Sequence, residues 1–226
     1  MLLARHAMRA IVWRMNTWER LWRTAGIQFV GLTILAYLIY GDLPGIGAPP
    51  DALAFYHSDR MRVLIASVLS GLAVLNLMWF AAALRTTLAD AGQDGWGAAA
   101  TASSAAVGAL AFVLIAAAAA LAYSNAAGLN DLAWTCGVVS SFPRAMLIMS
   151  SAFGLWRAKL IPNALFTAGV AVVILGVLGG TTWASGGFWA PDGAYSRFIL
   201  PVISLVWVLV VSRVLLTRVP ATRIGW

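Results

Sequence analysis

The sequence predicts an all-α membrane protein, a polytopic bundle of six transmembrane helices with both termini in the cytoplasm. Three observations lead to this prediction. Of the 226 residues, 62% are hydrophobic and only 10% are charged, whereas a soluble domain is about half apolar and about a quarter charged. Six apolar segments are long enough to cross a bilayer, which needs roughly 20 residues each. The basic residues concentrate on one side of these segments, as the positive-inside rule requires.

The first three predicted spans lie near residues 24–41, 63–84 and 97–123. Charged residues bound them, because a charge at mid-membrane depth is costly. Arg23 and Asp42 flank the first span, Arg62 and Arg85 flank the second, and the third follows Asp94.

The last three predicted spans lie near residues 132–156, 163–184 and 198–216, so one transmembrane domain covers residues 24–217. Asp131 and Arg157 bound the fourth span. Pro162 separates it from the fifth, and proline suits the first turn of a helix. No folded domain fits in the remaining segments, which are a short arm over residues 1–23, short loops and a tail over residues 218–226.

The distribution of basic residues predicts the orientation. With the N-terminus inside, eleven basic residues fall in cytoplasmic segments and three in outer loops. This asymmetry predicts a multi-pass protein of the plasma (cytoplasmic) membrane, and it accounts for most of the net charge of +7 without nucleic acid as a partner. The first apolar run begins only near residue 24 and has no cleavage site after it, so we expect a retained span and not a signal peptide.

The N-terminal arm has the pattern of an amphipathic helix on the inner membrane surface. Apolar residues recur at spacings of three and four, and Arg5, Arg9, Arg20 and Arg23 fall on the opposite face. We expect these arginines to contact anionic lipid headgroups. A docking site for a cytoplasmic partner is the alternative, and translation from Met15 in place of Met1 would shorten the arm.

The composition argues against several classes of membrane protein. Cys136 is the single cysteine, and the two histidines, His6 and His57, lie outside the apolar runs. We therefore expect no metal site, no haem between spans and no other cofactor. No Asp or Glu lies in the middle of a predicted span, which disfavours a transporter coupled to protons or sodium.

Arg144 is the one charged residue near the centre of a predicted span. An arginine there costs about 2.5–3.5 kcal/mol on insertion scales, and such residues usually have a function. Pro143 breaks the helix beside it and frees the carbonyl of Val139. With Asn76, Ser140 and Ser141 as further candidates, we predict a polar pocket for an anionic headgroup or solute. The alternative is that backbone carbonyls, Asn76 and water satisfy Arg144.

Two weaker signals lie elsewhere in the chain. His57 and Asp59, before the second span, have the residue types of a base and its orienting partner, although Asp59 is also a plausible helix cap. Gly176 and Gly180 form a small-xxx-small pair, which predicts close packing within the bundle or a contact with a second copy or another membrane protein.

Several short polar stretches resemble a class of six-span bacterial integral membrane proteins that carry a domain of unknown function. The matching stretches are Trp18-Glu19-Arg20, Phe55-Tyr56-His57-Ser58-Asp59-Arg60, Ala83-Leu84-Arg85, Leu129-Asn130-Asp131-Leu132, Phe142-Pro143 and Leu155-Trp156-Arg157-Ala158-Lys159-Leu160-Ile161-Pro162. The resemblance covers roughly residues 16–218. It implies the six-span architecture and no particular activity. The position after Phe-Pro is usually apolar in this class, so Arg144 departs from the pattern.

These observations favour a non-enzymatic accessory or lipid-interacting subunit. The first alternative is a small transporter or binder of a lipophilic or anionic molecule, with its site near Arg144. The second is an interfacial enzyme that uses His57 and Asp59. A polar cavity that reaches Arg144 would favour the binder, and a solid core with an exposed face of small residues would favour the subunit.

Overall fold

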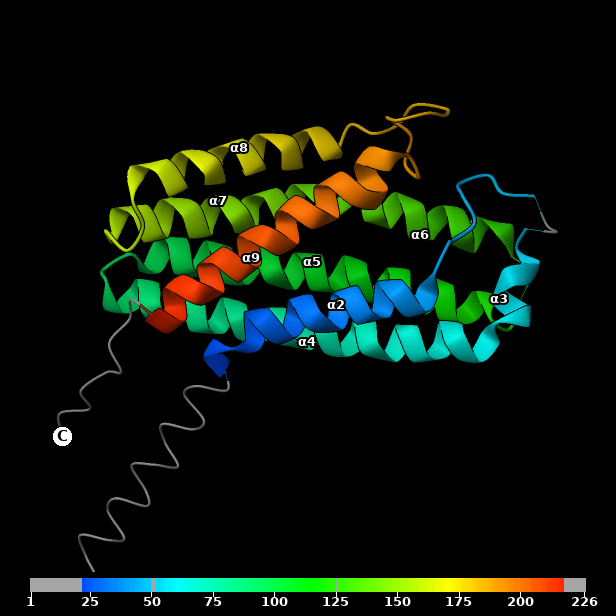
Figure 1. Ribbon diagram of the computed structural model, residues 1–226, viewed down its shortest axis with the longest axis horizontal. Helices are drawn as coiled ribbons and strands as arrows, with labels where there is room; N and C mark the ends of the chain where they lie inside the picture. The colour runs from blue at the N-terminus through cyan, green and yellow to red at the C-terminus, as the bar shows by residue number, and fades with distance from the viewer. Residues whose placement is uncertain (1–21, 50–51, 125, 218–226) are drawn as a thin grey trace, which may run out of the picture.

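The computed structural model describes residues 22–49, 52–124 and 126–217, which form an elongated helical bundle (Figure 1). The tail over residues 218–226 and residues 1–21 of the N-terminal arm lie outside the described residues, and so do the predicted headgroup contacts Arg5, Arg9 and Arg20. Arg23 lies two residues before the start of α2. The helices are α2 (Ala25–Tyr40), α3 (Ala54–Ser58), α4 (Arg60–Asp90), α5 (Asp94–Leu121), α6 (Ala127–Val139), α7 (Ser141–Arg157), α8 (Asn163–Gly179), the π-helical turn η1 (Tyr195–Ile199) and α9 (Leu200–Thr217).

Four helical segments in this part of the chain are long and apolar enough to cross a membrane. They are α4, α5, the α6–α7 segment and the η1–α9 segment. This confirms the all-α class and the presence of several apolar helices. The two other apolar helices, α2 and α8, have 16 and 17 residues, which correspond to about 24 and 26 Å at about 1.5 Å per residue.

The long helices run roughly side by side along the bundle (Figure 1). Helix α4 packs between α2 and α5, α7 packs between α5 and α8, and α9 returns across the bundle to contact α2. The start of α2 and the end of α9 lie at one end, which we call the terminal end. The loop after α2, helix α3 and the loop before η1 lie at the other, which we call the α3 end.

Helix α8 ends at Gly179, five residues before the predicted boundary, so the prediction of a helix through residue 184 is wrong. The cause is local hydrogen bonding. The Thr181 hydroxyl donates to the carbonyl of Leu178, and the Thr182 hydroxyl donates to the carbonyl of Gly179. The indole of Trp183 donates to the carbonyl of Gly180. These side chains satisfy the carbonyls that every helix C-terminus leaves without intrahelical partners.

Two prolines interrupt long helices. The fourth predicted span forms α6 and α7 with a break at Ser140, three residues before Pro143, as the sequence predicts. The sixth begins with the wider turn η1 just before Pro201. The ring of Pro201 would clash with the carbonyl of Arg197 in a regular α-helix, and a π-turn relieves that clash.

The small residues of α8 pack inside the bundle. A Cβ atom added to Gly176 would lie 3.0 Å from the Cβ atom of Ala145, and one added to Gly180 would overlap the ring of Phe142. Both neighbours belong to α7. The structure therefore uses this face for packing within the chain, one of the two alternatives that the spacing allows.

Candidate ligand-binding cavity

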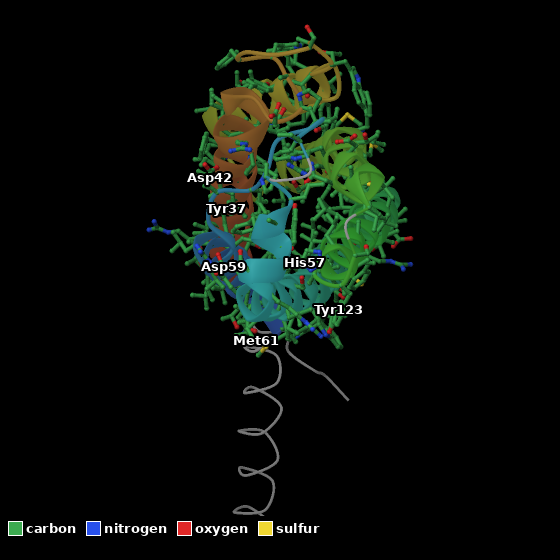
Figure 2. All side chains as sticks on the ribbon, turned by 90° about the vertical axis from the view of Figure 1, so that its right-hand side faces the viewer. Tyr37, Asp42, His57, Asp59, Met61 and Tyr123 are labelled. Carbon is green, nitrogen blue, oxygen red and sulfur yellow. The ribbon has the colours of Figure 1, made fainter. Side chains whose placement is uncertain are left out.

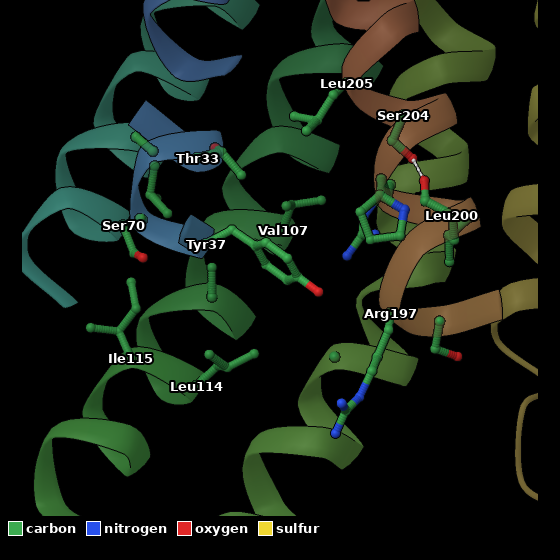
Figure 3. A pocket seen from close by; sticks show the side chains of 18 of the residues that line it. Thr33, Tyr37, Ser70, Val107, Leu114, Ile115, Arg197, Leu200, Ser204 and Leu205 are labelled. Atoms are coloured by element: carbon green, nitrogen blue, oxygen red, sulfur yellow. Dashed lines mark hydrogen bonds between the residues drawn. The ribbon is translucent and has the colours of Figure 1, made fainter. Parts of the chain in front are cut away.

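The bundle contains a partly open cavity of about 400 Å³, within the range of about 300–1,000 Å³ typical of small-molecule sites. Side chains of α2, α4, α5, α6, α7 and α9 line it, together with Tyr56 of α3 and residues of the loops at the α3 end. Toward the terminal end the space closes on a packed core, which includes Leu84, Leu88, Leu155 and Leu215. Figure 3 shows part of the lining.

Most of the cavity wall is apolar. Helix α4 contributes Val74, Leu77 and Phe80, and α5 and α9 contribute residues such as Leu114 and Leu200. These side chains can bury an apolar ligand, and each buried methylene group contributes about 0.8 kcal/mol. The few polar side chains on the wall therefore determine where a polar group of a ligand can lie.

Arg144 is the main polar feature of the cavity. It lies in the first turn of α7, where the helix restarts after Ser140, and it lines the cavity. Its Nη2 atom donates to the Ser140 hydroxyl at 2.6 Å, and that hydroxyl donates to the carbonyl of Gly137. Among the described residues, no carboxylate forms an ion pair with Arg144. Burying a cation without an anion is costly, so this geometry suits an anionic ligand.

Ser141 adds a second polar group. Its side chain is buried and lines the cavity, and its hydroxyl has no hydrogen-bond partner among the described residues. A buried hydroxyl without a partner costs about 1–3 kcal/mol. The sequence candidates Arg144, Ser140 and Ser141 thus meet at one place, where Arg144 can supply charge and Ser141 a further hydrogen bond.

A second arginine, Arg197 of η1, also lines the cavity but is already paired. Its Nη1 atom lies 2.7 Å from a carboxylate oxygen of Asp42, and its Nη2 atom donates to the carbonyl of Leu43. Its guanidinium also lies over the ring of Trp134, 5.1 Å from the ring centroid. These contacts hold Arg197 against the loop after α2. Among the described residues that line the cavity, Arg144 is therefore the arginine without a carboxylate partner, while Arg197 keeps only its Nε unpaired.

The loop after α2 forms a cap over the α3 end of the cavity; we call residues 41–48 the cap loop. Two side chains of α6 bind its backbone, because Asn130 donates to the carbonyl of Gly45 at 2.7 Å and Trp134 donates to that of Pro44 at 2.8 Å. Asp131 accepts a hydrogen bond from the backbone N–H of Gly47 at 2.8 Å. Each bond contributes about 0.5–1.5 kcal/mol, so the cap loop is held firmly.

A buried hydrogen bond extends this network to α3. The Tyr56 hydroxyl donates to Oδ1 of Asn130 at 2.9 Å, and both side chains are buried. Burial raises the pKa of the Tyr56 phenol above its ordinary value, because desolvation disfavours the phenolate. Tyr56 therefore stays a hydrogen-bond donor at neutral pH, and α3, α6 and the cap loop are joined through Asn130.

The structure separates Asn76 from Arg144. Asn76 does not line the cavity, and its amide donates to the carbonyl of Leu72, one turn earlier on α4. The expected contact between Asn76 and Arg144 is thus not formed in the described structure. The position of a residue along its helix does not fix the direction in which its side chain leaves that helix.

His57 and Asp59, the weaker candidates of the sequence, lie at the α3 end of the bundle. His57 is exposed on α3, and Asp59 precedes α4 and lies 3.6 Å from Arg62 in an ion pair (Figure 2). Asp131 binds the backbone of the cap loop. These two acidic groups therefore have structural partners among the described residues.

No protein-family model, curated protein or solved structure matches this chain.

Sequence reasoning missed the residues that close the cavity. Asn130 stands only within one of the stretches that carry the resemblance, Trp134 belongs to none of them, and Arg197 counts only as one of three outer basic residues. Their importance comes from contacts across 85 to 155 residues of sequence. The one available signal was the position of Asn130 next to Asp131 at the start of a predicted span.

Proposed function

We propose that this protein binds a lipophilic anion in its central cavity, with Arg144 as the counter-ion. The observation that carries the proposal is a partly buried guanidinium that lines an apolar cavity and has no carboxylate partner among the described residues. An amphiphile with one anionic group matches both features, because its apolar part is buried while its charge is neutralised.

We also infer that α2 and α8 cross the membrane with the four longer segments, which makes six spans with both termini in the cytoplasm. The start of α2 and the end of α9 lie at the same end of the bundle, in agreement with an even number of spans (Figure 1). Arg85, Arg157 and Lys159 lie in or next to the turns at that end, which supports its assignment as the cytoplasmic side.

This proposal favours a binder or carrier over an accessory subunit without a ligand. A subunit that acts through helix contacts alone needs no cavity of this size and no partly buried cation without a carboxylate partner. The small residues Gly176 and Gly180, which would have supported a contact surface, are covered by α7.

The direct test compares dodecanoate with dodecan-1-ol, which has the same chain and no charge. The full-length protein is reconstituted in phosphatidylcholine nanodiscs, and affinity is measured by displacement of a brominated dodecanoate that quenches tryptophan fluorescence. Trp134 and Trp207 line the cavity and act as reporters. We expect tighter binding of the acid by the wild type.

The variant Arg144→Leu should lose this preference. Truncating one partner of a buried, hydrogen-bonded charge pair costs about 2–5 kcal/mol, which corresponds to a weakening of about 30-fold or more for dodecanoate. Binding of the alcohol should be unchanged. Arg60→Leu is the matched control, because Arg60 lies at the α3 end over the ring of Tyr123 and does not line the cavity. Equal affinities of wild type and Arg144→Leu for dodecanoate would refute the proposal.

A further inference from the structure

We propose that the ligand is a membrane-dissolved anion with a single acyl chain, and that it enters from the bilayer between α2 and α9 through a gate formed by Tyr37 and Phe198. This inference rests on the proposed function and adds the class of ligand and its route.

Helices α2 and α9 touch at the terminal end and separate toward the α3 end (Figure 1). A Cβ atom added to Gly26 of α2 would overlap the Ser212 hydroxyl of α9, so the two helices are in close contact there. Nearer the α3 end, two whole aromatic side chains fill the space between them. The ring centroids of Tyr37 and Phe198 lie 6.4 Å apart in an edge-to-face contact.

Tyr37 lies at the margin of the cavity. It lines the cavity, yet its residue surface is 45% exposed, and Figure 3 shows its ring reaching from α2 toward α9. Phe198, 51% exposed, contacts it from the η1–α9 segment. Rotation of these two side chains would widen the passage from the partly open cavity to the outer surface without moving a helix.

The surface around this gate is apolar. Leu38 on α2 and Val202 on α9 are among the most exposed hydrophobic residues, at 68% and 57%, and Ile34 and Val206 extend the apolar rim on the two helices. An apolar rim of this kind suits contact with lipid chains and not with water. A ligand that passes this gate therefore comes from the membrane.

The alternative route, through the cap loop, is closed more firmly. Opening it would break the hydrogen bonds of Asn130, Trp134 and Asp131 to the cap loop and the two contacts of Arg197 with Asp42 and Leu43. Opening the gate breaks one aromatic contact. The cavity volume of about 400 Å³ lies near the lower end of the range for ligand sites, which suits one acyl chain and not the two chains of a phospholipid.

The experiment measures the rate at which brominated dodecanoate, delivered in phosphatidylcholine vesicles, quenches the tryptophan fluorescence of the reconstituted full-length protein. In a Cys136→Ser background, Tyr37→Cys and Phe198→Cys are joined by a short reducible bis-methanethiosulfonate linker. We expect the linker to slow quenching by about tenfold or more. Reduction should restore the rate, and the equilibrium affinity should stay the same. Each single-cysteine variant treated with the linker is the control.

A second pair of variants avoids cross-linking. Tyr37→Ala with Phe198→Ala removes the gate and should speed quenching, whereas Val68→Ala with Leu75→Ala removes exposed side chains of α4 that do not line the cavity and should leave the rate unchanged. The inferred route is overturned if the linked protein binds as fast as the reduced one, or if both alanine pairs behave alike.

The outcomes distinguish the route from the function. An Arg144-dependent affinity with an unchanged rate in the linked protein would retain the proposed function and reject the gate. Absence of binding by the wild type would reject both. Displacement of the probe by phosphatidylglycerol vesicles as effectively as by free dodecanoate would overturn the assignment of a single-chain ligand.

Discussion

Asn130 provides the sharpest test of how the α3 end is held together. Its side chain is 1% exposed and makes two hydrogen bonds, one from the Tyr56 hydroxyl and one to the carbonyl of Gly45. The substitution Asn130→Ala removes both bonds at once. It also leaves the Tyr56 hydroxyl buried without a partner.

The expected loss follows from these contacts. Two hydrogen bonds contribute about 1 kcal/mol each, and a buried hydroxyl without a partner costs about 1–3 kcal/mol. Gly45 is half-buried, so water can replace the lost hydrogen bond to its carbonyl, and losing that bond costs less stability. We therefore expect Asn130→Ala to lower the free energy of unfolding by about 2–4 kcal/mol.

The assay is equilibrium unfolding of the detergent-solubilised protein by sodium dodecyl sulfate, followed by circular dichroism. A double-mutant cycle with Tyr56→Phe isolates the bond between the two side chains, and we expect a coupling energy of about 1 kcal/mol. The matched control is Asn76→Ala, because Asn76 binds only a carbonyl of its own helix and its loss should change stability by less than about 0.5 kcal/mol. Equal effects of the two asparagine substitutions, or an additive cycle, would refute the reasoning.

Two further outcomes are expected from the same unfolding assay. Burial raises the pKa of Tyr56 in the folded state, so the unfolded protein loses this proton at a lower pH than the folded protein. The free energy of unfolding is therefore unaffected below the ordinary pKa of about 10 and decreases as the pH rises above that value. The decrease in the free energy of unfolding should approach 1.4 kcal/mol per pH unit. Tyr56→Phe should remove this part of the decrease, and an unchanged pH profile of the variant would contradict the role of Tyr56. Gly26→Ala should destabilise by about 1–3 kcal/mol through overpacking against Ser212, whereas Gly31→Ala, which meets open space, should be neutral or stabilising by up to about 1 kcal/mol. Similar effects of the two glycine substitutions would contradict the close contact of α2 and α9.

The apolar segments and their approximate limits were predictable from the sequence. Long runs of hydrophobic residues bounded by charges identify helices such as α4 and α5 without any tertiary information, because burial in an apolar phase depends on composition along the chain. The break near Ser140 was predictable because the effect of Pro143 on the backbone is local. The end of α8 was not, because the hydroxyls of Thr181 and Thr182 outweighed the apolar character of the residues that follow.

The candidate site, too, was predictable from the sequence only in part. Arg144 stood out because a cation inside an apolar run is costly wherever its neighbours lie, and Ser140 and Ser141 are its neighbours along the chain. The residues that complete the cavity did not stand out. Asn130, Arg197 and Tyr37 are ordinary polar or aromatic residues near the ends of predicted spans.

The sequence by itself therefore determined an all-helical protein with several helices apolar enough to cross a membrane and with one anomalous charge inside an apolar segment, since hydrophobic burial and backbone propensity act on neighbouring residues. Only the tertiary structure decided that this charge lines a cavity, that Asn76 is not its partner, and that α2 and α9 separate where Tyr37 meets Phe198. These are properties of helix rotation and crossing, which depend on contacts between residues far apart in the chain.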